Sequence, residues 1–121
     1  MVKMKNIIII NFTDLLSVDL MNSILSINSQ IQIDEYKNFE KLKITNQQAC
    51  FIIVNSLSDI PDTKYAAEII NETSITFYLI TINMEPELIE KSLLTKSVKA
   101  VISGLGQKHL ITKLNELINM V

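Results

Sequence analysis

Polar or glycine residues follow the apolar runs of this 121-residue chain, and these positions are the first candidates for chemistry. They are Asn11, Phe12, Asn55, Thr81 and Gly104. Amides and a hydroxyl can hold a ligand, but none of these side chains is a carboxylate. Mg²⁺ in proteins is usually held by at least one carboxylate. The set therefore predicts a pocket without bound Mg²⁺ or another cofactor.

Two acids stand close to these positions. Asp14 lies three residues after Asn11, and Asp59 lies four residues after Asn55. Either could fold back toward the strand ends, which remains an alternative. Loop acids more often cap helices or stabilise turns, and we interpret Asp14 as a helix cap.

The other reactive residue types are isolated in the sequence. Cys50 precedes a buried run with no histidine near it in the sequence, so we interpret it as an inert, packed thiol. His109 has no second ligand at metal-binding spacing and is interpreted as a surface residue. Gly104-Leu105-Gly106 lacks the further glycine and lysine of a phosphate loop, which favours a simple turn. We therefore expect no catalytic residue and no metal site.

The composition limits the class of protein. With 48% hydrophobic residues, the chain is expected to form one compact domain over residues 1–121. A net charge of -2 gives no field that attracts nucleic acid or an anionic membrane surface. A single cysteine and the absence of any long apolar stretch argue against a secreted or membrane-spanning protein. We expect a cytoplasmic protein that makes no direct contact with nucleic acid.

The apolar pattern alternates between short β-branched runs and segments of helical period. Strands are predicted at residues 7–10, 31–33, 51–54, 77–80 and 100–102. Helices are predicted near residues 14–27, 39–42, 65–70, 86–93 and 110–121, with Thr13 or Asp14 capping the first. Right-handed crossovers arrange such a chain as a flavodoxin-like (βα)5 three-layer sandwich, with a parallel five-stranded sheet in the order 2-1-3-4-5. Ligands of such sheets bind at the carboxyl ends of the strands.

This layout resembles the receiver domain of response regulators, the CheY-like family, over essentially the whole chain. The family carries an acidic pair after the first strand, an acceptor aspartate after the third, a hydroxyl after the fourth and a lysine after the fifth. At these positions the chain has Asn11-Phe12, Asn55, Thr81 and Gly104, and Val101 replaces the aromatic switch residue. The resemblance implies a degenerate receiver in which Thr81 alone keeps its residue type, either as a switch hydroxyl or as a residue that bonds nearby backbone.

A receiver scaffold whose site has lost its charged signature residues implies a regulatory module of two-component signal transduction. Such a module would work without phosphorylation and would not be an enzyme. It would act as a homodimer or dock a protein partner, and could be the N-terminal part of a transcription regulator. The resemblance points to the surface of the fourth helix, fifth strand and fifth helix, with Leu94, Lys96, Lys99, Ile111 and Asn115 as candidate contacts. One alternative is a small-molecule sensor that uses the vacated pocket near Phe12, Asn55 and Thr81. The other is a receiver that is still phosphorylated, with Asp14 or Asp59 as the phosphoacceptor.

Overall fold

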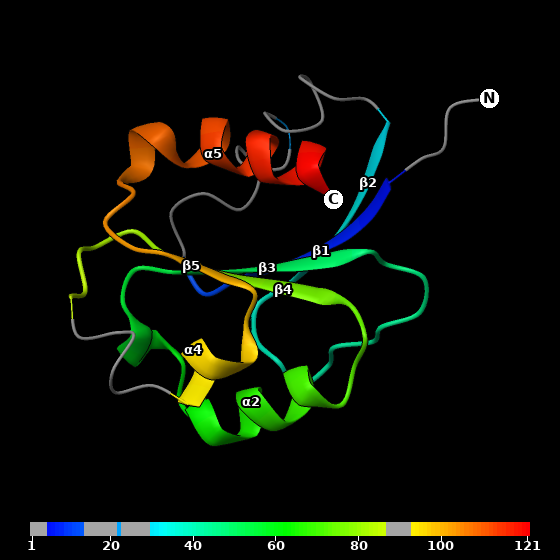
Figure 1. Cartoon of the computed structure of the whole chain (residues 1–121), viewed down its shortest axis with the longest axis horizontal. Helices are drawn as coiled ribbons and strands as arrows, with labels where there is room; N and C mark the ends of the chain where they lie inside the picture. The colour runs from blue at the N-terminus through cyan, green and yellow to red at the C-terminus, as the bar shows by residue number, and fades with distance from the viewer. Residues whose placement is uncertain (1–4, 14–21, 23–29, 87–92) are drawn as a thin grey trace.

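Five parallel strands form the centre of the protein. The computed structural model describes residues 5–13, 22, 30–86 and 93–121. The strands are β1 Lys5–Asn11, β2 Ile31–Tyr36, β3 Ala49–Val54, β4 Thr76–Thr81 and β5 Ala100–Ile102. All neighbours pair in parallel, in the order β2-β1-β3-β4-β5 (Figure 1). This is the predicted sheet, and its order is that of a flavodoxin-like α/β fold.

Helices cover both faces of this sheet. The helix α5 (Gln107–Met120) lies on one face, and α2 (Thr63–Asn71) and α4 (Leu93–Ser97) lie on the other, so the protein has three layers (Figure 1). A short 3-10 helix, η1 (Leu57–Asp59), follows β3. Among the described helices, none has the length and apolar content needed to cross a bilayer. The helix predicted over 14–27 and the first part of that over 86–93 lie outside the described residues, apart from position 22 and Pro86.

The isoleucine run explains why β1 is central. A strand covered on both faces needs apolar side chains on both sides of the pleat, and β1 supplies four consecutive buried isoleucines. Ile7 and Ile9 pack in the core beneath α5, whereas Ile8 and Ile10 pack in the core on the α2 side. The apolar run of β3 divides in the same way, and both strands lie where their patterns predicted.

The helix α5 contributes a wide apolar stripe to the first core. Its buried residues are Leu110, Leu114, Leu117 and Ile118. The predicted stripe ended at Val121, but Ile118 is the fully buried residue of the last turn and Val121 is only partly buried. Lys5 of β1 donates its Nζ to the carbonyl oxygen of Ile118 at 3.0 Å, an oxygen that also accepts from the Val121 amide at 3.2 Å, and so adds a second donor at the end of the helix.

The helix predicted near residues 39–42 is wrong. Residues 37–48 form turns and bends. Asn38 Oδ1 accepts a hydrogen bond from the Glu40 amide at 2.9 Å, and Gln47 Oε1 accepts one from the Thr45 amide at 2.7 Å. Such side-chain bonds give the backbone an alternative to helical pairing. Phe39 anchors the segment by burying its ring in the core on the α2 side.

The two edges of the sheet differ in length. The strand β2 at one edge has six residues with mostly half-buried side chains, as its alternating pattern predicted. The strand β5 at the other edge has only three, all half-buried. Short edge strands limit unwanted pairing between sheets, and Lys99 immediately before β5 adds an exposed charge there.

Candidate functional site

The carboxyl ends of β1, β3, β4 and β5 meet at one end of the sheet. We call the described residues there the carboxyl rim: Asn11–Thr13, Asn55–Asp59, Thr81–Glu85 and Ser103–Gly106. Backbone hydrogen bonds continue beyond the strands, from the Asn83 amide to the Asn55 carbonyl at 3.0 Å and from the Leu105 amide to the Thr81 carbonyl at 3.3 Å. The loops that would surround a ligand are therefore bonded to one another.

Asn11 lies at the first predicted pocket position and is 1% exposed. Its Oδ1 accepts hydrogen bonds from the Thr13 amide at 3.0 Å and the Thr13 hydroxyl at 2.6 Å. Its Nδ2 has no partner among the described residues. Thr13, one of the two predicted helix caps, uses its hydroxyl on Asn11, and the helix that it would cap lies outside the described part of the chain. The oxygen of Asn11 thus organises the chain after β1.

Phe12 turns away from the other rim positions. Its ring lies 6.0 Å, centroid to centroid, from the ring of Phe39, and it packs against the core on the α2 side. The described pocket beside it, of about 100 Å³, is lined by neither Asn55 nor Thr81. This pocket is therefore not the one predicted from Phe12, Asn55 and Thr81.

Asp59, the alternative phosphoacceptor, bonds to the backbone of the loop that carries it. Its Oδ2 accepts from the Asn55 amide at 2.9 Å and from the Ser56 amide at 3.3 Å. These bonds form a capping box at the start of η1, which is the common role of a loop acid. Asp14, the other candidate, lies outside the described residues.

Thr81 is fully buried and takes part in a small polar network. Its Oγ1 lies 3.1 Å from the Asn83 carbonyl oxygen and 3.0 Å from Ser103 Oγ. Ser103 Oγ also accepts from the Glu85 amide at 2.8 Å. Of the two interpretations of Thr81, these contacts match the second, a hydroxyl that bonds nearby backbone at a strand end.

Glu85 links two loops that are far apart in the sequence. Its Oε1 accepts a hydrogen bond from the Leu57 amide at 2.9 Å, which joins the loop after β4 to the loop after β3. Neither this role nor that of Ser103 was predicted from the sequence. The position of Ser103 directly after an apolar run could have marked it, but the 28-residue separation of Glu85 and Leu57 leaves no local signal.

Gly104 stands where the receiver family has its lysine, and its backbone restricts replacement. Its φ of +72° lies in the left-handed region. A Cβ built at this position would lie 2.7 Å from Cε of Met84, a side chain that is 71% exposed. A lysine here would therefore strain the backbone and displace the Met84 side chain.

Replacing Gly104 with alanine is expected to lower the free energy of unfolding by about 1–2 kcal/mol, the cost of a left-handed residue that carries a Cβ. Gly106 is no control for this position, since its ψ of 157° at a φ of +74° lies in a region that almost only glycine adopts. The control is Met84→Ala: in urea denaturation, Gly104→Ala should cost less in the Met84→Ala background than in wild type, by the part of the loss that comes from the contact with Met84. A neutral Gly104→Ala would contradict the left-handed backbone.

Cys50 and His109 lie where the sequence predicted them. Cys50 is fully buried in β3, and burial raises the pKa of its thiol well above the ordinary value. The reactive thiolate is therefore suppressed at neutral pH. His109 is exposed near the start of α5. The described residues include no group of three or more His, Cys, Asp or Glu side chains arranged to hold a metal ion.

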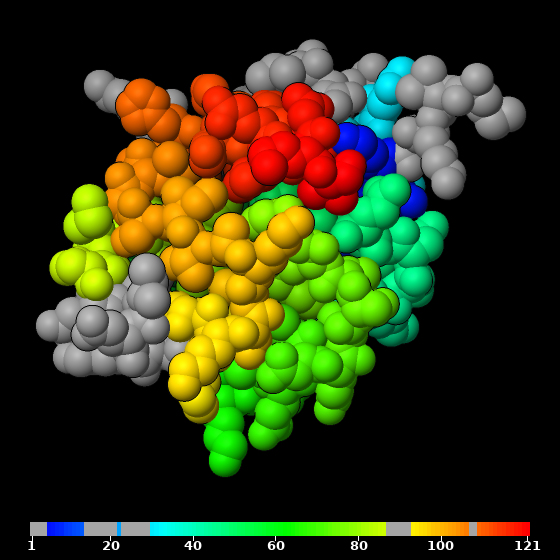
Figure 2. All heavy atoms as spheres, in the orientation of Figure 1, coloured from blue at the N-terminus to red at the C-terminus, as the bar shows by residue number. Residues whose placement is uncertain are grey.

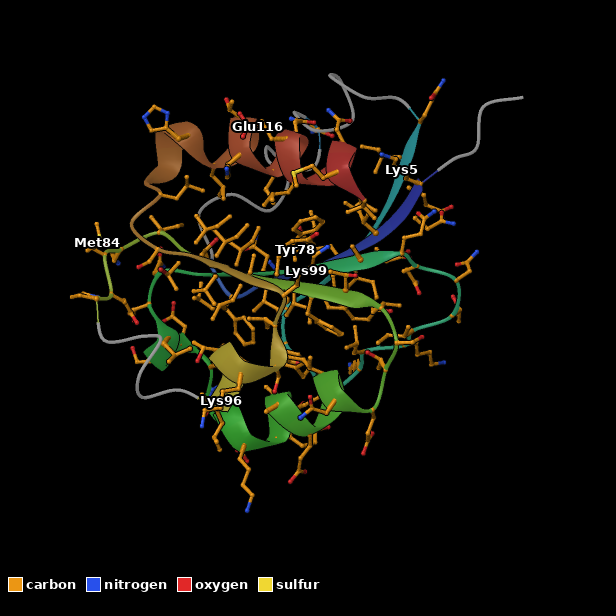
Figure 3. All side chains as sticks on the ribbon, in the orientation of Figure 1. Lys5, Tyr78, Met84, Lys96, Lys99 and Glu116 are labelled. Carbon is orange, nitrogen blue, oxygen red and sulfur yellow. The ribbon has the colours of Figure 1, made fainter. Side chains whose placement is uncertain are left out.

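The candidate interface residues divide into buried and accessible ones. Leu94 is 0% exposed within the core on the α2 side, so its prediction as a surface contact is wrong: it is a packing residue of α4. Lys96 and Lys99 are exposed, one on each side of the turn that leads from α4 into β5 (Figure 3). Ile111 and Asn115 are half-buried on α5. Val101, the predicted switch position, is half-buried and packs against the same core as Leu94.

The topology and the rim define a flavodoxin-like α/β protein whose described strand-end side chains mainly bond to neighbouring loops. The chain matches no family model, no curated protein and no solved structure in the three comparisons made. Its function must therefore be argued from its own residues.

Proposed function

We propose that this protein is a regulatory interaction module that works without aspartyl phosphorylation, as a receiver-like domain that dimerises or docks a protein partner. The observation that carries the proposal is that the rim side chains form hydrogen bonds with the protein's own loops. Asp59 accepts from two backbone amides, Glu85 accepts from the Leu57 amide, and Thr81 lies within bonding distance of Ser103 and Asn83.

The rim chemistry supports a non-catalytic role. In a receiver domain, transfer of a phosphoryl group to an aspartate requires that aspartate's free carboxylate, a metal to neutralise charge and a cation near the transferred oxygens. Asn11 and Asn55 supply amides, and Gly104 supplies no cation. Hydrogen bonds of the polar network join the loops after β3, β4 and β5 to one another, which suits a scaffold whose outer surface contacts a partner.

The surface proposed for this contact is formed by α4, β5 and α5. Figure 2 shows these elements side by side on one face of the molecule, with α5 above β5 and α4 below. The outer edge of β5 pairs with no other described strand, and Lys96 and Lys99 form no ion pair with any described residue. Glu116 of α5 is exposed on the same side, where it pairs with Lys113 of its own helix at 3.4 Å (Figure 3). Exposed charges of both signs on this face support self-complementary contacts between side chains, in which a two-fold axis uses each contact twice.

Reversing the two lysines tests this surface. We expect wild-type protein to show a concentration-dependent increase in mass by size-exclusion chromatography with light scattering. Lys96→Glu/Lys99→Glu should weaken that association about tenfold, through loss and reversal of exposed charge pairs. The matched control, Lys37→Glu/Lys43→Glu, makes the same charge change on the exposed part of the segment before β3 and should associate as wild type does.

Two results would count against the proposed surface. One is equal association of both double variants. The other is a wild-type chain that stays monomeric at high concentration while the two variants recover the same partners as wild type in a pull-down.

A further inference from the structure

Two buried side-chain atoms on neighbouring strands have no hydrogen-bond partner among the described residues. They are Nδ2 of Asn11, at the end of β1, and Oε2 of Glu35, on β2. Buried polar groups are nearly always hydrogen-bonded, because an unpaired group has lost its contacts with water and has gained nothing in their place. One of these two atoms is a donor and the other is an acceptor, so one bound group can satisfy both.

The orientation of the Asn11 carboxamide is fixed by its other end. Its Oδ1 accepts hydrogen bonds from the Thr13 amide at 3.0 Å and from the Thr13 hydroxyl at 2.6 Å. An exchange of Oδ1 and Nδ2 would place the NH2 group against the backbone N–H of Thr13, which can only donate. Asn11 is 1% exposed, so its Nδ2 does not reach bulk water. Nδ2 is therefore a buried donor that needs an acceptor.

Asn11 and Glu35 project from the same face of the sheet. Side chains alternate between the two faces along a strand. Ile9 lies two residues before Asn11 and belongs to the core beneath α5, and Ile33 lies two residues before Glu35 and packs against that same core. Ile9 is also the partner of Glu35 across the two strands (Figure 1). With a rise of about 3.3 Å per residue and about 4.8 Å between strands, the Cα atoms of Asn11 and Glu35 lie about 8 Å apart.

The chemistry of the two atoms limits what can lie between them. Asn11 Nδ2 needs a group that accepts a hydrogen bond, and neither a metal cation nor an ammonium group accepts one. Glu35 Oε2 needs a group that donates a hydrogen bond, and a carboxylate repels an anion. A water molecule both accepts and donates, and buried waters commonly bridge polar groups that other protein atoms leave unpaired.

We infer that a buried water molecule bridges these two side chains, accepting from Asn11 Nδ2 and donating to Glu35 Oε2. It completes a chain of hydrogen bonds from the Thr13 hydroxyl through the Asn11 carboxamide to the carboxyl group of Glu35. A bridge of this kind is nearly as favourable in enthalpy as a direct hydrogen bond. The water thus connects the edge strand β2 to the chain after β1, and the site does not depend on the proposed α4–β5–α5 contact.

Nuclear Overhauser effects between water and the ¹⁵N-labelled full chain test this site in solution. A water molecule that stays bound while the protein tumbles gives cross-peaks to the side-chain NH2 protons of Asn11, with the sign opposite to that of surface water. We expect these cross-peaks in the wild-type protein. In a crystal structure, the same water should lie within about 3.2 Å of both Asn11 Nδ2 and Glu35 Oε2.

The matched variants are Glu35→Gln and Glu35→Met. Glutamine keeps a carbonyl oxygen that can accept from the water, whereas methionine has a similar length and places a methyl group there. Glu35→Gln should therefore keep the cross-peaks, and Glu35→Met should lose them. Glu40→Met makes the same change at an exposed residue and should leave them unchanged. Amide shifts that stay unchanged outside β1 and β2 will show that each variant folds as wild type does.

Four results would overturn the inference. The wild-type protein could give no cross-peak between water and the Asn11 NH2 protons. The cross-peaks could persist in Glu35→Met, which would assign them to exchange through the Thr13 hydroxyl. In the crystal, either atom could bond directly to another protein group, or a metal ion could lie against the Glu35 carboxyl group.

Discussion

Replacing Phe51 with alanine is expected to lower the free energy of unfolding by about 3–5 kcal/mol, the usual loss for a fully buried phenylalanine. Phe51 is 0% exposed in the central strand β3, and its ring stacks on Tyr78 with centroids 5.0 Å apart and planes 10° apart. The stacking adds about 0.5–1.5 kcal/mol to area burial. Because domains are stable by only about 5–15 kcal/mol, this variant should lie close to the limit of folding.

Urea denaturation followed by circular dichroism measures this loss. Met120→Ala is the control, because the side chain of Met120 is 75% exposed and its removal should change stability by about 0.5 kcal/mol or less. The double variant Phe51→Ala/Tyr78→Ala should lose less than the sum of the single variants, since the two rings pack on each other. Full additivity would contradict the stacked geometry.

Replacing Asn11 with leucine is expected to cost about 1–3 kcal/mol, because it leaves two buried donors without an acceptor, at about 1–3 kcal/mol each, and removes one buried Nδ2 donor that has no partner among the described residues. Those donors are the amide and the hydroxyl of Thr13, which is 1% exposed. Leucine branches at Cγ as asparagine does but carries no oxygen there. The variant therefore tests whether Asn11 organises the chain after β1.

A double-mutant cycle with Thr13→Val isolates the interaction. In wild type, Thr13→Val should destabilise the protein by about 0.5–1.5 kcal/mol through the loss of one hydrogen bond. In the Asn11→Leu background it should be neutral or stabilising, because it removes a donor that has already lost its acceptor. Equal effects of Thr13→Val in both backgrounds would refute the bond.

The sequence was sufficient to predict the sheet because central and edge strands differ in how many of their faces are buried. Strands covered on both faces need continuous apolar runs, which residues 7–10 and 51–54 supply, and an edge strand tolerates the alternation seen at Ile31 and Ile33. The segment 37–48 was mispredicted because Phe39 and Leu42 have helical spacing, while the turn is set by Asn38 and Gln47 bonding to the backbone. Hydrophobic spacing carries no information about such bonds.

The rim was predicted less completely than the fold. The residue types at Asn11, Asn55, Thr81 and Gly104 could be read from the ends of the apolar runs, and the structure places all of them at the carboxyl ends of strands. The direction of Phe12 could not be read, since it depends on its contact with Phe39 from another segment. The direction of Leu94 could not be read either, because its prediction as a surface residue did not take into account the packing of α4 against α2.

The described rim side chains bond to neighbouring loops, and the proposal assigns the contact with a partner to the α4–β5–α5 face. A contact at that face requires no covalent switch. The account therefore depends on the absence of an acyl-phosphate at this rim.

Intact-mass spectrometry after incubation with acetyl phosphate and Mg²⁺ tests that dependence most directly. A receiver domain with its acidic pair intact, treated in the same tube, is the positive control. We predict that the control gains the mass of one phosphoryl group while this protein keeps its original mass. An adduct of one phosphoryl group on this chain, located to Asp59 or Asp14, would contradict the account.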